Sequence, residues 1–348
     1  MKYALSFAIL LLAGALASCN TGCTSNCKSG SDNASPALSG AAEPLVRQRA
    51  DPYIHRTPAG HYYFIATAPE FDRIELRSAT SLAGIKTAVA KTVWRKHNTG
   101  ALGANIWAPE LHYANNTWYI YFAAAEAENP WLIRMQVLAN KAADPMQGTW
   151  EELGRVQTAR DSFSLDATRF EHKGQAYLVW AQKDPEETLN SALYIAKLLS
   201  PTQVGSPEVE ISRPELAWEV QGYKVNEGAA VLIRNGKIFI SYSASATDHR
   251  YAMGLLWADA EADLLNPASW HKLPEPVFTT NENLKRYGPG HNSFTKGDDG
   301  ETDFMVYHAR DYLRLQGTPL TDPNRHTYIR RLAWTSGGLP DFEQDKPD

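Results

Sequence analysis

Cysteine is almost absent from this sequence of 348 residues. Its three cysteines are Cys19, Cys23 and Cys27, and none occurs after residue 27. A disulfide framework therefore cannot hold the bulk of the chain together, and stability has to come from packing. Cys23 and Cys27 do not define a metal site by themselves, because two thiolates supply only half of the ligands of a structural zinc ion.

Positive charge is also scarce. The 34 Lys and Arg residues are outnumbered by 39 Asp and Glu residues, which gives a formal net charge of -5. This balance supplies no basic surface for phosphate contacts, so nucleic acid is not an expected partner. No glycine-rich phosphate loop follows a predicted strand, and no nucleotide or redox cofactor is expected. With 43% hydrophobic residues, the chain can nevertheless bury a large core.

Long hydrophobic runs are limited to the start of the chain. Lys2 precedes a nearly apolar run over residues 3–16, which is short for a transmembrane helix but typical of an export signal. The segment LASC at residues 16–19 resembles the lipobox of bacterial lipoproteins, which implies removal of residues 1–18 and lipidation of Cys19. An ordinary cleaved signal with a free thiol is the alternative. The resemblance predicts an exported lipoprotein anchored to a membrane, periplasmic or on the cell surface, and leaves the membrane leaflet open.

Residues 19–43 are rich in Ser, Ala and Gly and show no apolar period, which is typical of a flexible linker. No second stretch of this kind follows, so residues 44–348 are predicted to form one domain. A body of that size is large for a single core and favours a repeat architecture.

A repeat of about 60 residues runs through this body. In each unit an extended stretch leads into a tight turn and then into a strand rich in Tyr, Trp or Phe, which is the pattern of a β-hairpin. A further β-rich run follows the hairpin in every unit. The five extended stretches begin at Asp51, Ala108, Asp166, Glu227 and His291, and their turns lie at Gly60, Asn116, Gly174, Gly236 and Gly300.

Three clear strands and a weaker fourth, repeated five times, predict an all-β fold, namely a five-bladed β-propeller. Runs such as TWYIYFAAA at 117–125 and KIFISYSAS at 237–245 hold the β-branched and aromatic residues that strands prefer, which disfavours helices. The innermost strands of a propeller line its central channel. Equivalent positions at the starts of these strands therefore face one another.

This arrangement would bring three carboxylates and one histidine to the same channel mouth: Asp51, Asp166, Glu227 and His291. Hydrolysis of a glycosidic bond needs an acid for the leaving oxygen and a base for water. Carboxyl groups held close together have separated pKa values, which suits both tasks. Oxygen ligands of this kind also suit Ca2+, so a bound cation is the alternative reading.

The body as a whole resembles glycoside hydrolase family 43, enzymes with five-bladed propellers that act on polysaccharides containing arabinose and xylose. The resemblance covers residues 44–348 and rests on six short motifs that occur in the family's order. They are ADPY at 50–53, IWAPE at 106–110, SLDA at 164–167, VNEG at 225–228, GHNS at 290–293 and NRHT at 324–327.

The resemblance implies an inverting mechanism and a role for each matched residue. Asp51 is expected to act as general base, Glu227 as general acid, and Asp166 as the residue that orients the acid and modulates its pKa. Trp107 is expected to form a wall of the sugar pocket, with bracing of the blade as the alternative. Arg325 is expected to reach the active site, where it could bind sugar hydroxyls.

Other candidates are weaker. Glu110 belongs to the same motif as Trp107 and is expected to be structural rather than the acid. His291 could bind a channel ion such as Ca2+, directly or through water, or could be a hydrogen-bonded histidine at the axis, and both readings stay open. Three further histidines show no ligand spacing and are expected to be structural: His55, His112 and His308. The predicted chemistry requires no cofactor.

Finer resemblances favour one activity. Residues 69–77, 307–310 and 322–326 resemble the exo-acting α-L-arabinofuranosidases of the family. We therefore expect release of terminal α-L-arabinofuranosyl residues from arabinan, arabinoxylan or their oligosaccharides, with an arabinose-containing plant polysaccharide as the partner. A β-xylosidase of the same family and a non-catalytic carbohydrate-binding propeller are the alternatives. The sequence indicates no oligomeric state.

Overall fold

The computed structural model describes residues 43–348. The predicted signal peptide, Cys19 and nearly all of the predicted linker lie outside these residues. Within residues 43–348, no helix has the length and apolar character needed to span a membrane. This part of the chain is almost entirely β-structure, and its only helices are three short 3-10 helices: η1 (Ala83–Lys86), η2 (Ala217–Glu219) and η3 (Pro267–Ser269).

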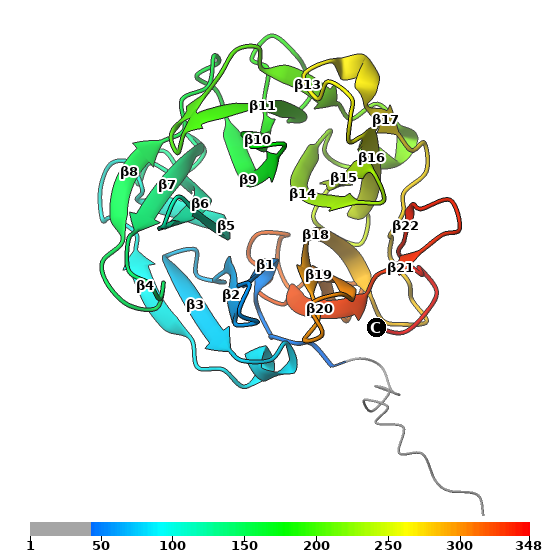
Figure 1. Cartoon of the computed structure of the whole chain (residues 1–348), viewed down its shortest axis with the longest axis horizontal. Coiled ribbons are helices and arrows are strands. Elements are labelled where there is room, and N and C mark those ends of the chain that lie inside the picture. The colour runs from blue at the N-terminus through cyan, green and yellow to red at the C-terminus, as the bar shows by residue number, and fades with distance from the viewer. Residues whose placement is uncertain (1–42) are drawn as a thin grey trace, which may run out of the picture. The chain divides into compact units, whose positions relative to one another are not determined.

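The strands form five antiparallel blades arranged in a ring (Figure 1). Blade 1 contains β1 (Ala50–Arg56), β2 (Tyr62–Thr67), β3 (Arg73–Ala79) and β4 (Lys91–Arg95). Blade 2 contains β5 (Ala104–Ala114), β6 (Thr117–Ala125), β7 (Arg134–Asn140) and β8 (Glu151–Arg155). Blade 3 contains β9 (Ser164–His172), β10 (Gln175–Gln182), β11 (Ala192–Ser200), β12 (Gln203–Val204) and β13 (Val209–Ser212).

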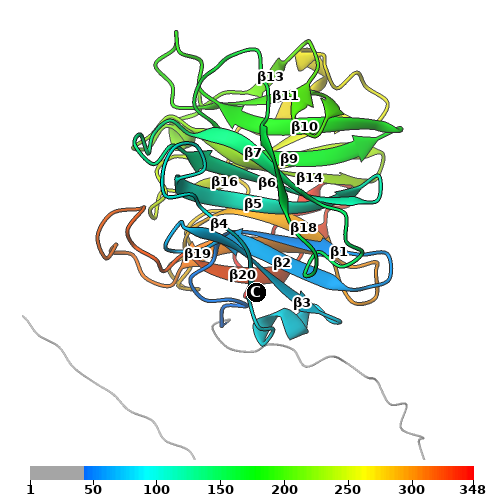
Figure 2. The same ribbon diagram turned by 90° about the vertical axis from the view of Figure 1, so that its left-hand side faces the viewer.

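Blade 4 contains β14 (Asn226–Arg234), β15 (Lys237–Ala244), β16 (Ala252–Asp259) and β17 (His271–Lys272). Blade 5 contains β18 (Tyr287–Lys296), β19 (Asp303–Arg310) and β20 (His326–Arg331). A small two-stranded sheet follows, made of β21 (Ala333–Trp334) and β22 (Pro340–Asp341). Figure 2 shows the ring from the side, with blade 1 in blue near the bottom and blade 3 in green near the top.

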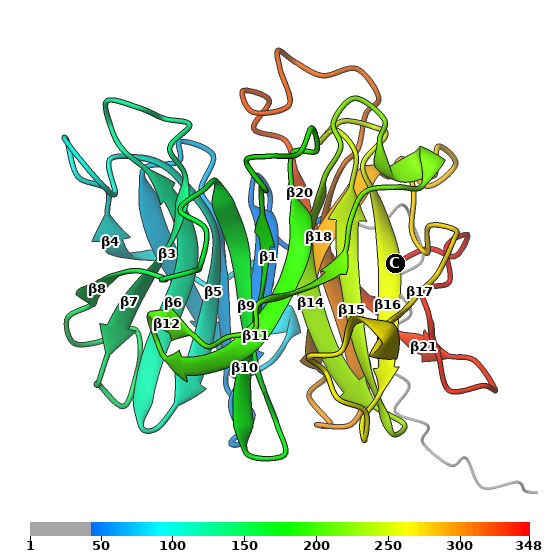
Figure 3. The ribbon, with the colours of Figure 1, turned by 90° about the horizontal axis from the view of Figure 1, so that it is seen from above.

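The ring confirms the predicted five-bladed propeller. Each of the inner strands β1, β5, β9, β14 and β18 contacts the next one, and β18 contacts β1 to complete the circle (Figure 1). Figure 3 shows the molecule edge-on, with the inner strands in the middle and outer strands such as β8 and β17 on either side. The start of the body also helps to close the ring, because Val46 pairs with Thr327 of β20. The backbone N–H of Thr327 donates to the carbonyl oxygen of Val46 at 2.8 Å.

The predicted hairpin turns occur at the predicted residues. All five turn positions have a positive φ, which glycine and asparagine adopt more readily than other residues. The φ values are 83° at Gly60, 58° at Asn116, 76° at Gly174, 71° at Gly236 and 74° at Gly300. The turn chemistry of the sequence therefore sets the period of the propeller.

Five hydrophobic clusters form the core of the described residues, and each lies mainly between two neighbouring blades. Strand β6 shows how the alternation of side chains produces this pattern. Ile120 and Phe122 pack toward blade 1, whereas Tyr121 between them packs toward blade 3. Because both faces of a central strand are buried, the sequences of these strands are nearly continuous apolar runs. Packing between neighbouring blades therefore holds the blades in place around the channel.

Candidate active site

Every inner strand contains a β-bulge near its start. The pairing of the inner strand with the second strand of its blade shifts at the same point in all five blades. The first residue of each bulge has a positive φ: Asp51, Ala108, Asp166, Gly228 and His291. Bulges re-aim side chains and are frequent beside active sites. All of these residues except Gly228 line one cavity.

The bulges correct the alignment of the fourth repeat. The sequence pattern aligns Glu227 with Asp51 and Asp166, but the structure places Gly228 at that position. Glu227 instead lies one residue before the bulge, where blade 2 has Trp107. Gly228 is the only glycine among the five bulge residues, and a Cβ atom there would crowd the His291 ring at 3.0 Å. Glu227 therefore leaves its strand from a different position than the two aspartates.

The cavity at this end of the channel has a volume of about 540 Å3. Its walls come from the inner strands and from loops that include residues 318–320. The structure brings all the predicted site residues of the propeller to this cavity: Asp51, Trp107, Asp166, Glu227, His291 and Arg325. Residues that are distant in the chain thus meet in one place, as the repeat predicted.

Asp51 is buried among three nitrogen-bearing side chains. Its Oδ1 lies 3.2 Å from Arg325 Nη1, 3.3 Å from His291 Nδ1 and 3.3 Å from His308 Nδ1. Burial alone would raise the pKa of Asp51, but the charge of Arg325, followed by His291, outweighs burial and holds this pKa well below its usual range. Asp51 is therefore ionised at neutral pH, as a general base has to be.

Thr67 fixes the second oxygen of Asp51. The Thr67 hydroxyl donates a hydrogen bond to Asp51 Oδ2 at 2.6 Å and accepts one from the backbone N–H of Ala108 at 2.7 Å. The two bonds connect the bulge of blade 1 to the bulge of blade 2. Asp51 is thus held in one orientation by groups that also hold the blades together.

Glu227 has a different environment. Its Oε1 accepts a hydrogen bond from the hydroxyl of the buried Tyr251 at 2.9 Å. Burial and the negative charge of Asp166 raise the pKa of Glu227 to about 7, against the opposing effects of His291 and Tyr251. Gly290 makes room for this contact, because a Cβ atom there would lie 2.5 Å from the Tyr251 ring. Glu227 can therefore carry a proton near neutral pH, as a general acid has to.

Asp166 is connected to both of the other carboxyl groups through the residues between them, His291 and Gly228. Its Oδ2 accepts a hydrogen bond from the backbone N–H of Gly228 at 2.9 Å and lies 3.8 Å from His291 Nδ1. Burial, followed by the charge of Asp51, raises the pKa of Asp166 well above its usual range, and the Gly228 bond opposes this shift. Asp166 thus contacts the residue that directly follows Glu227.

His308 is buried beside the site and does not line the cavity, which agrees with the structural role expected from the sequence. Burial lowers the pKa of His308 to about 3, so its ring is neutral at neutral pH. Its Nδ1 accepts a hydrogen bond from the backbone N–H of Asp51 at 3.1 Å, and its ring stacks on Tyr251 with centroids 5.7 Å apart. His308 therefore positions the partner of the predicted acid as well as the predicted base.

In three blades, the same position on the second strand carries a polar residue that holds the bulge of the next blade. Thr67, Ser243 and His308 each pair with the residue just before the bulge of their own blade. Each also binds the backbone N–H of the bulge residue in the next blade, at 2.7 Å for Ala108, 2.7 Å for His291 and 3.1 Å for Asp51. A polar residue at this point of the second strand is the signal that could have identified Thr67 and His308 from the sequence.

Glu110 is buried and does not line the cavity. Its Oε2 lies 2.9 Å from Nε2 of His112. Burial raises the pKa of Glu110 to about 8 and lowers the pKa of His112 to about 3. Burial thus disfavours the charged forms of both groups, and the two side chains pair with each other. This pairing agrees with a structural role for both residues.

His291 faces carboxylates rather than a complete set of metal ligands. In residues 43–348, no three His, Cys, Asp or Glu side chains are grouped so that they could hold a metal ion. His291 Nδ1 lies 3.3 Å from Asp51 Oδ1, and its backbone N–H donates to Ser243 Oγ at 2.7 Å. A channel ion bound by His291 through water stays a prediction.

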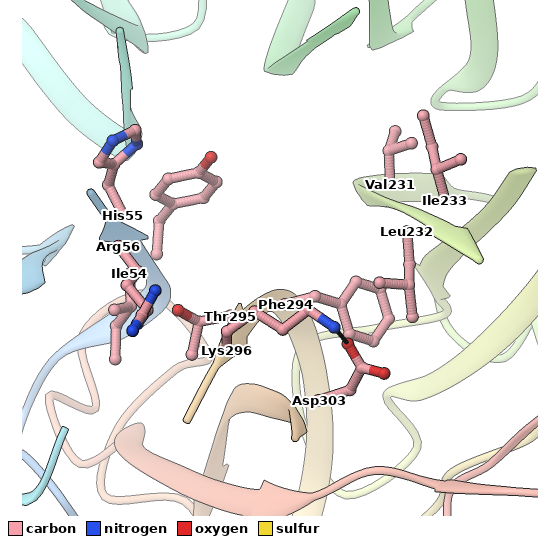
Figure 4. Close-up of a pocket in the computed structure, with 11 residues that line it drawn as sticks. Ile54, His55, Arg56, Val231, Leu232, Ile233, Phe294, Thr295, Lys296 and Asp303 are labelled. Carbon is pink, nitrogen blue, oxygen red and sulfur yellow. Dashed lines mark ion pairs between the residues drawn. The ribbon is translucent and has the colours of Figure 1, made fainter. Parts of the chain in front are cut away.

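A second pocket, of about 270 Å3, is lined by the later residues of β1, β14 and β18, away from the bulges (Figure 4). Lys296 and Asp303 form an ion pair there, with Nζ 2.7 Å from Oδ1. None of Asp51, Asp166 and Glu227 lines this pocket. The candidate active site is therefore the larger cavity.

Fold and site together define a class of protein. A β-propeller whose channel mouth holds an ionised carboxylate beside carboxyl groups of raised pKa has the parts of a glycoside hydrolase. The chain belongs to glycosyl hydrolases family 43, whose family model matches residues 41–340. This confirms the family that the sequence motifs indicated.

Similar proteins agree with this membership. The chain is 51% identical over 309 residues to an extracellular exo-α-(1→5)-L-arabinofuranosidase of Streptomyces avermitilis, covering 89% of this chain and 64% of that protein. It is 53% identical over 287 residues to the protein of the same name from Streptomyces chartreusis, covering 82% of this chain and 88% of that protein. The crystal structure of an α-L-arabinofuranosidase from Lactobacillus brevis matches with a TM-score of 0.84 and 47% identity, over 87% of this chain and 96% of that one.

Proposed function

We propose that the protein is an inverting, exo-acting α-L-arabinofuranosidase. It releases terminal α-L-arabinofuranosyl residues from arabinan, arabinoxylan or their oligosaccharides. Relatives that are named as arabinofuranosidases and share about half of their aligned residues with this chain support arabinofuranose as the released sugar. The observation that carries the chemistry is the contrast between two carboxyl groups in one cavity, with the pKa of Asp51 held low and that of Glu227 raised to about 7.

The mechanism assigns one proton transfer to each of these groups. Ionised Asp51 takes a proton from a water molecule as the water oxygen bonds to the anomeric carbon. Protonated Glu227 gives its proton to the glycosidic oxygen as the bond from the anomeric carbon to that oxygen breaks. The products are free arabinose and the shortened chain. Asp51 and Glu227 then exchange protons with solvent to restore the starting state.

Other residues of the cavity support these two transfers. Arg325 lies 3.2 Å from Asp51, so it keeps the base ionised, and its remaining donors are free to bind sugar hydroxyls. Trp107 offers an aromatic wall for the sugar ring in the cavity. Asp166 positions Glu227 through the backbone of Gly228 and raises the pKa of the acid.

An assay with two aryl glycosides tests this proposal. We expect turnover of 4-nitrophenyl α-L-arabinofuranoside and little turnover of 4-nitrophenyl β-D-xyloside. Glu227→Gln should reduce turnover of α-(1→5)-linked arabinotriose by on the order of 100-fold or more, because the amide cannot protonate the sugar leaving group. The same variant should affect turnover of the nitrophenyl glycoside less, since 4-nitrophenolate leaves without a proton. Preferred turnover of the xyloside would indicate a β-xylosidase. Oligosaccharide binding without turnover of either compound would indicate a carbohydrate-binding propeller.

The proposal places the enzyme on a membrane through Cys19. This part rests on the lipobox-like segment at residues 16–19. Expression in a bacterium with an alkyne-labelled fatty acid tests it. The wild-type chain should carry the label and Cys19→Ser should not. An unlabelled wild-type chain would leave the ordinary cleaved signal as the explanation.

The proposed chemistry needs no metal ion, and a Ca2+ ion near His291 would have a structural role. We expect dialysis against EDTA to leave kcat within about twofold of the untreated value, because acid and base are both carboxyl groups. Added CaCl2 should raise the midpoint of thermal unfolding if the ion binds the folded chain. Loss of turnover in EDTA, restored by Ca2+, would contradict a purely structural ion.

A further inference from the structure

Trp131 is an unusual tryptophan in this protein. The chain has ten tryptophans, all within the described residues, and Trp131 is the one that is exposed, at 63%. Large aromatic side chains are seldom left in solvent at this extent, because burying them is favourable. Trp131 packs in none of the five hydrophobic clusters of residues 43–348. Folding therefore does not account for its presence.

Trp131 lines the candidate active-site cavity together with Trp107. The two rings have centroids 6.4 Å apart and an interplanar angle of 67°. Trp107 is half-buried and packs against the largest core cluster, whereas Trp131 is exposed. The pair therefore forms a wall that runs from the interior of the cavity outward to solvent.

The loop that carries Trp131 is held in place. Pro130 and Trp131 are the central residues of a β-turn, which closes with the backbone N–H of Leu132 donating to the carbonyl oxygen of Asn129 at 3.0 Å. The Asn105 side-chain amide donates to the carbonyl oxygen of Pro130 at 2.6 Å. The backbone that presents the indole is therefore held in place, which lowers the entropy cost of ordering this loop when a ligand binds.

We infer that Trp131 binds the second sugar of the substrate, the one that leaves with the rest of the chain. This inference rests on the proposed function. The sugar to be cleaved occupies the interior, beside Glu227, and the next ring has to lie further out, where Trp131 is exposed. A neutral indole face suits the apolar C–H face of an uncharged sugar ring. Trp131 then raises kcat/KM for neutral oligosaccharides relative to kcat/KM for glycosides with a small leaving group.

The test compares two substrates that differ in this second sugar. Methyl α-L-arabinofuranoside has only the sugar to be cleaved, whereas α-(1→5)-linked arabinotriose has neighbours beyond it. We expect Trp131→Ala to lower the ratio of kcat/KM for the triose to kcat/KM for the methyl glycoside by about 10-fold, the loss of one ring-stacking contact. Trp131→Phe should retain most of the ratio, because it keeps an aromatic face.

Tyr113→Ala is the matched control. Tyr113 is another exposed aromatic residue of blade 2, 45% exposed, but it lines neither pocket. This variant should leave the ratio unchanged. An unchanged ratio in Trp131→Ala, or equal losses on both substrates, would overturn the inference.

Failure of the proposed function gives a different result. If the wild-type chain hydrolyses neither compound, the activity is wrong, and binding then decides the role of Trp131. Isothermal titration of arabino- and xylo-oligosaccharides into wild type and Trp131→Ala should still show weaker binding to the variant. Equal affinities in that titration would overturn the inference as well.

Discussion

The carboxylate of Asp166 accepts a hydrogen bond from the backbone N–H of Gly228 at 2.9 Å, and Gly228 directly follows Glu227 in the chain. This hydrogen bond connects Asp166 of blade 3 to strand β14 of blade 4, at the residue next to the proposed acid. The same carboxylate raises the pKa of Glu227. One side chain thus affects both the position and the proton affinity of its neighbour.

Replacing Asp166 with Asn separates these two effects. The amide oxygen can still accept the Gly228 bond, but the negative charge is gone. Because that charge raises the pKa of Glu227, its loss lowers this pKa, and the alkaline limb of the kcat/KM profile should move to lower pH. We expect kcat to fall on the order of 100-fold. An alkaline limb that stays in place in Asp166→Asn would show that Asp166 does not tune Glu227.

Replacing Tyr251 with Phe should move the alkaline limb of the kcat/KM profile to higher pH, opposite to the effect of Asp166→Asn. The Tyr251 hydroxyl stabilises the charged form of Glu227, which lowers its pKa. Without the hydroxyl the pKa of Glu227 rises, and the alkaline limb shifts to higher pH. The orientation of the acid is also less well fixed, so kcat should fall about 10-fold. The ring of Phe can keep the stacking on His308, and thermal unfolding of the variant checks that the fold is intact.

Arg325 should control the acidic limb. After burial, which raises the pKa of Asp51, the Arg325 charge is the largest effect on this group and lowers its pKa. Arg325→Gln should therefore raise the pKa of Asp51 and move the acidic limb of kcat/KM to higher pH. The alkaline limb serves as an internal control and should move less. A profile with an unchanged acidic limb would argue against Asp51 as the base.

Gly228 and Gly236 form a matched pair for testing the bulge. Both have a positive φ, 60° and 71°, but a Cβ atom at Gly236 would meet open space, whereas one at Gly228 would meet the His291 ring. We expect Gly236→Ala to lose about 1 kcal/mol of unfolding free energy and to keep its activity. Gly228→Ala should lose more stability and most of its activity, measured by urea unfolding and by kcat. Full activity in Gly228→Ala would show that the crowded bulge is not needed.

The repeat of the propeller could be predicted from the sequence because turn chemistry is local. Gly60, Asn116 and the equivalent turn residues are where the backbone needs a positive φ, and their spacing places the inner strands. The convergence of Asp51 and Asp166 follows directly from that spacing. The β-bulges could not be predicted from the sequence, because a one-residue shift in strand pairing does not change the pattern of apolar and polar residues. This is why Glu227 was aligned one residue too early.

The partners of the carboxylates were harder to predict. Tyr251 lies just before β16, and His308 lies within β19, so neither belongs to an inner strand. Tyr251 meets Glu227 across blade 4, and His308 meets Asp51 from the neighbouring blade, so both contacts depend on how separate strands pack rather than on the spacing along one strand. Arg325, by contrast, was expected to reach the site from its motif, and it lies 3.2 Å from Asp51.

The stereochemistry of the first product tests the central claim most directly. Proton NMR during hydrolysis of an α-L-arabinofuranoside, recorded before the free sugar equilibrates, identifies the anomer that the enzyme releases. If Asp51 activates water on the face opposite the oxygen protonated by Glu227, β-L-arabinofuranose appears first and the α-anomer follows by mutarotation. Initial release of the α-anomer would contradict this account of the two carboxyl groups.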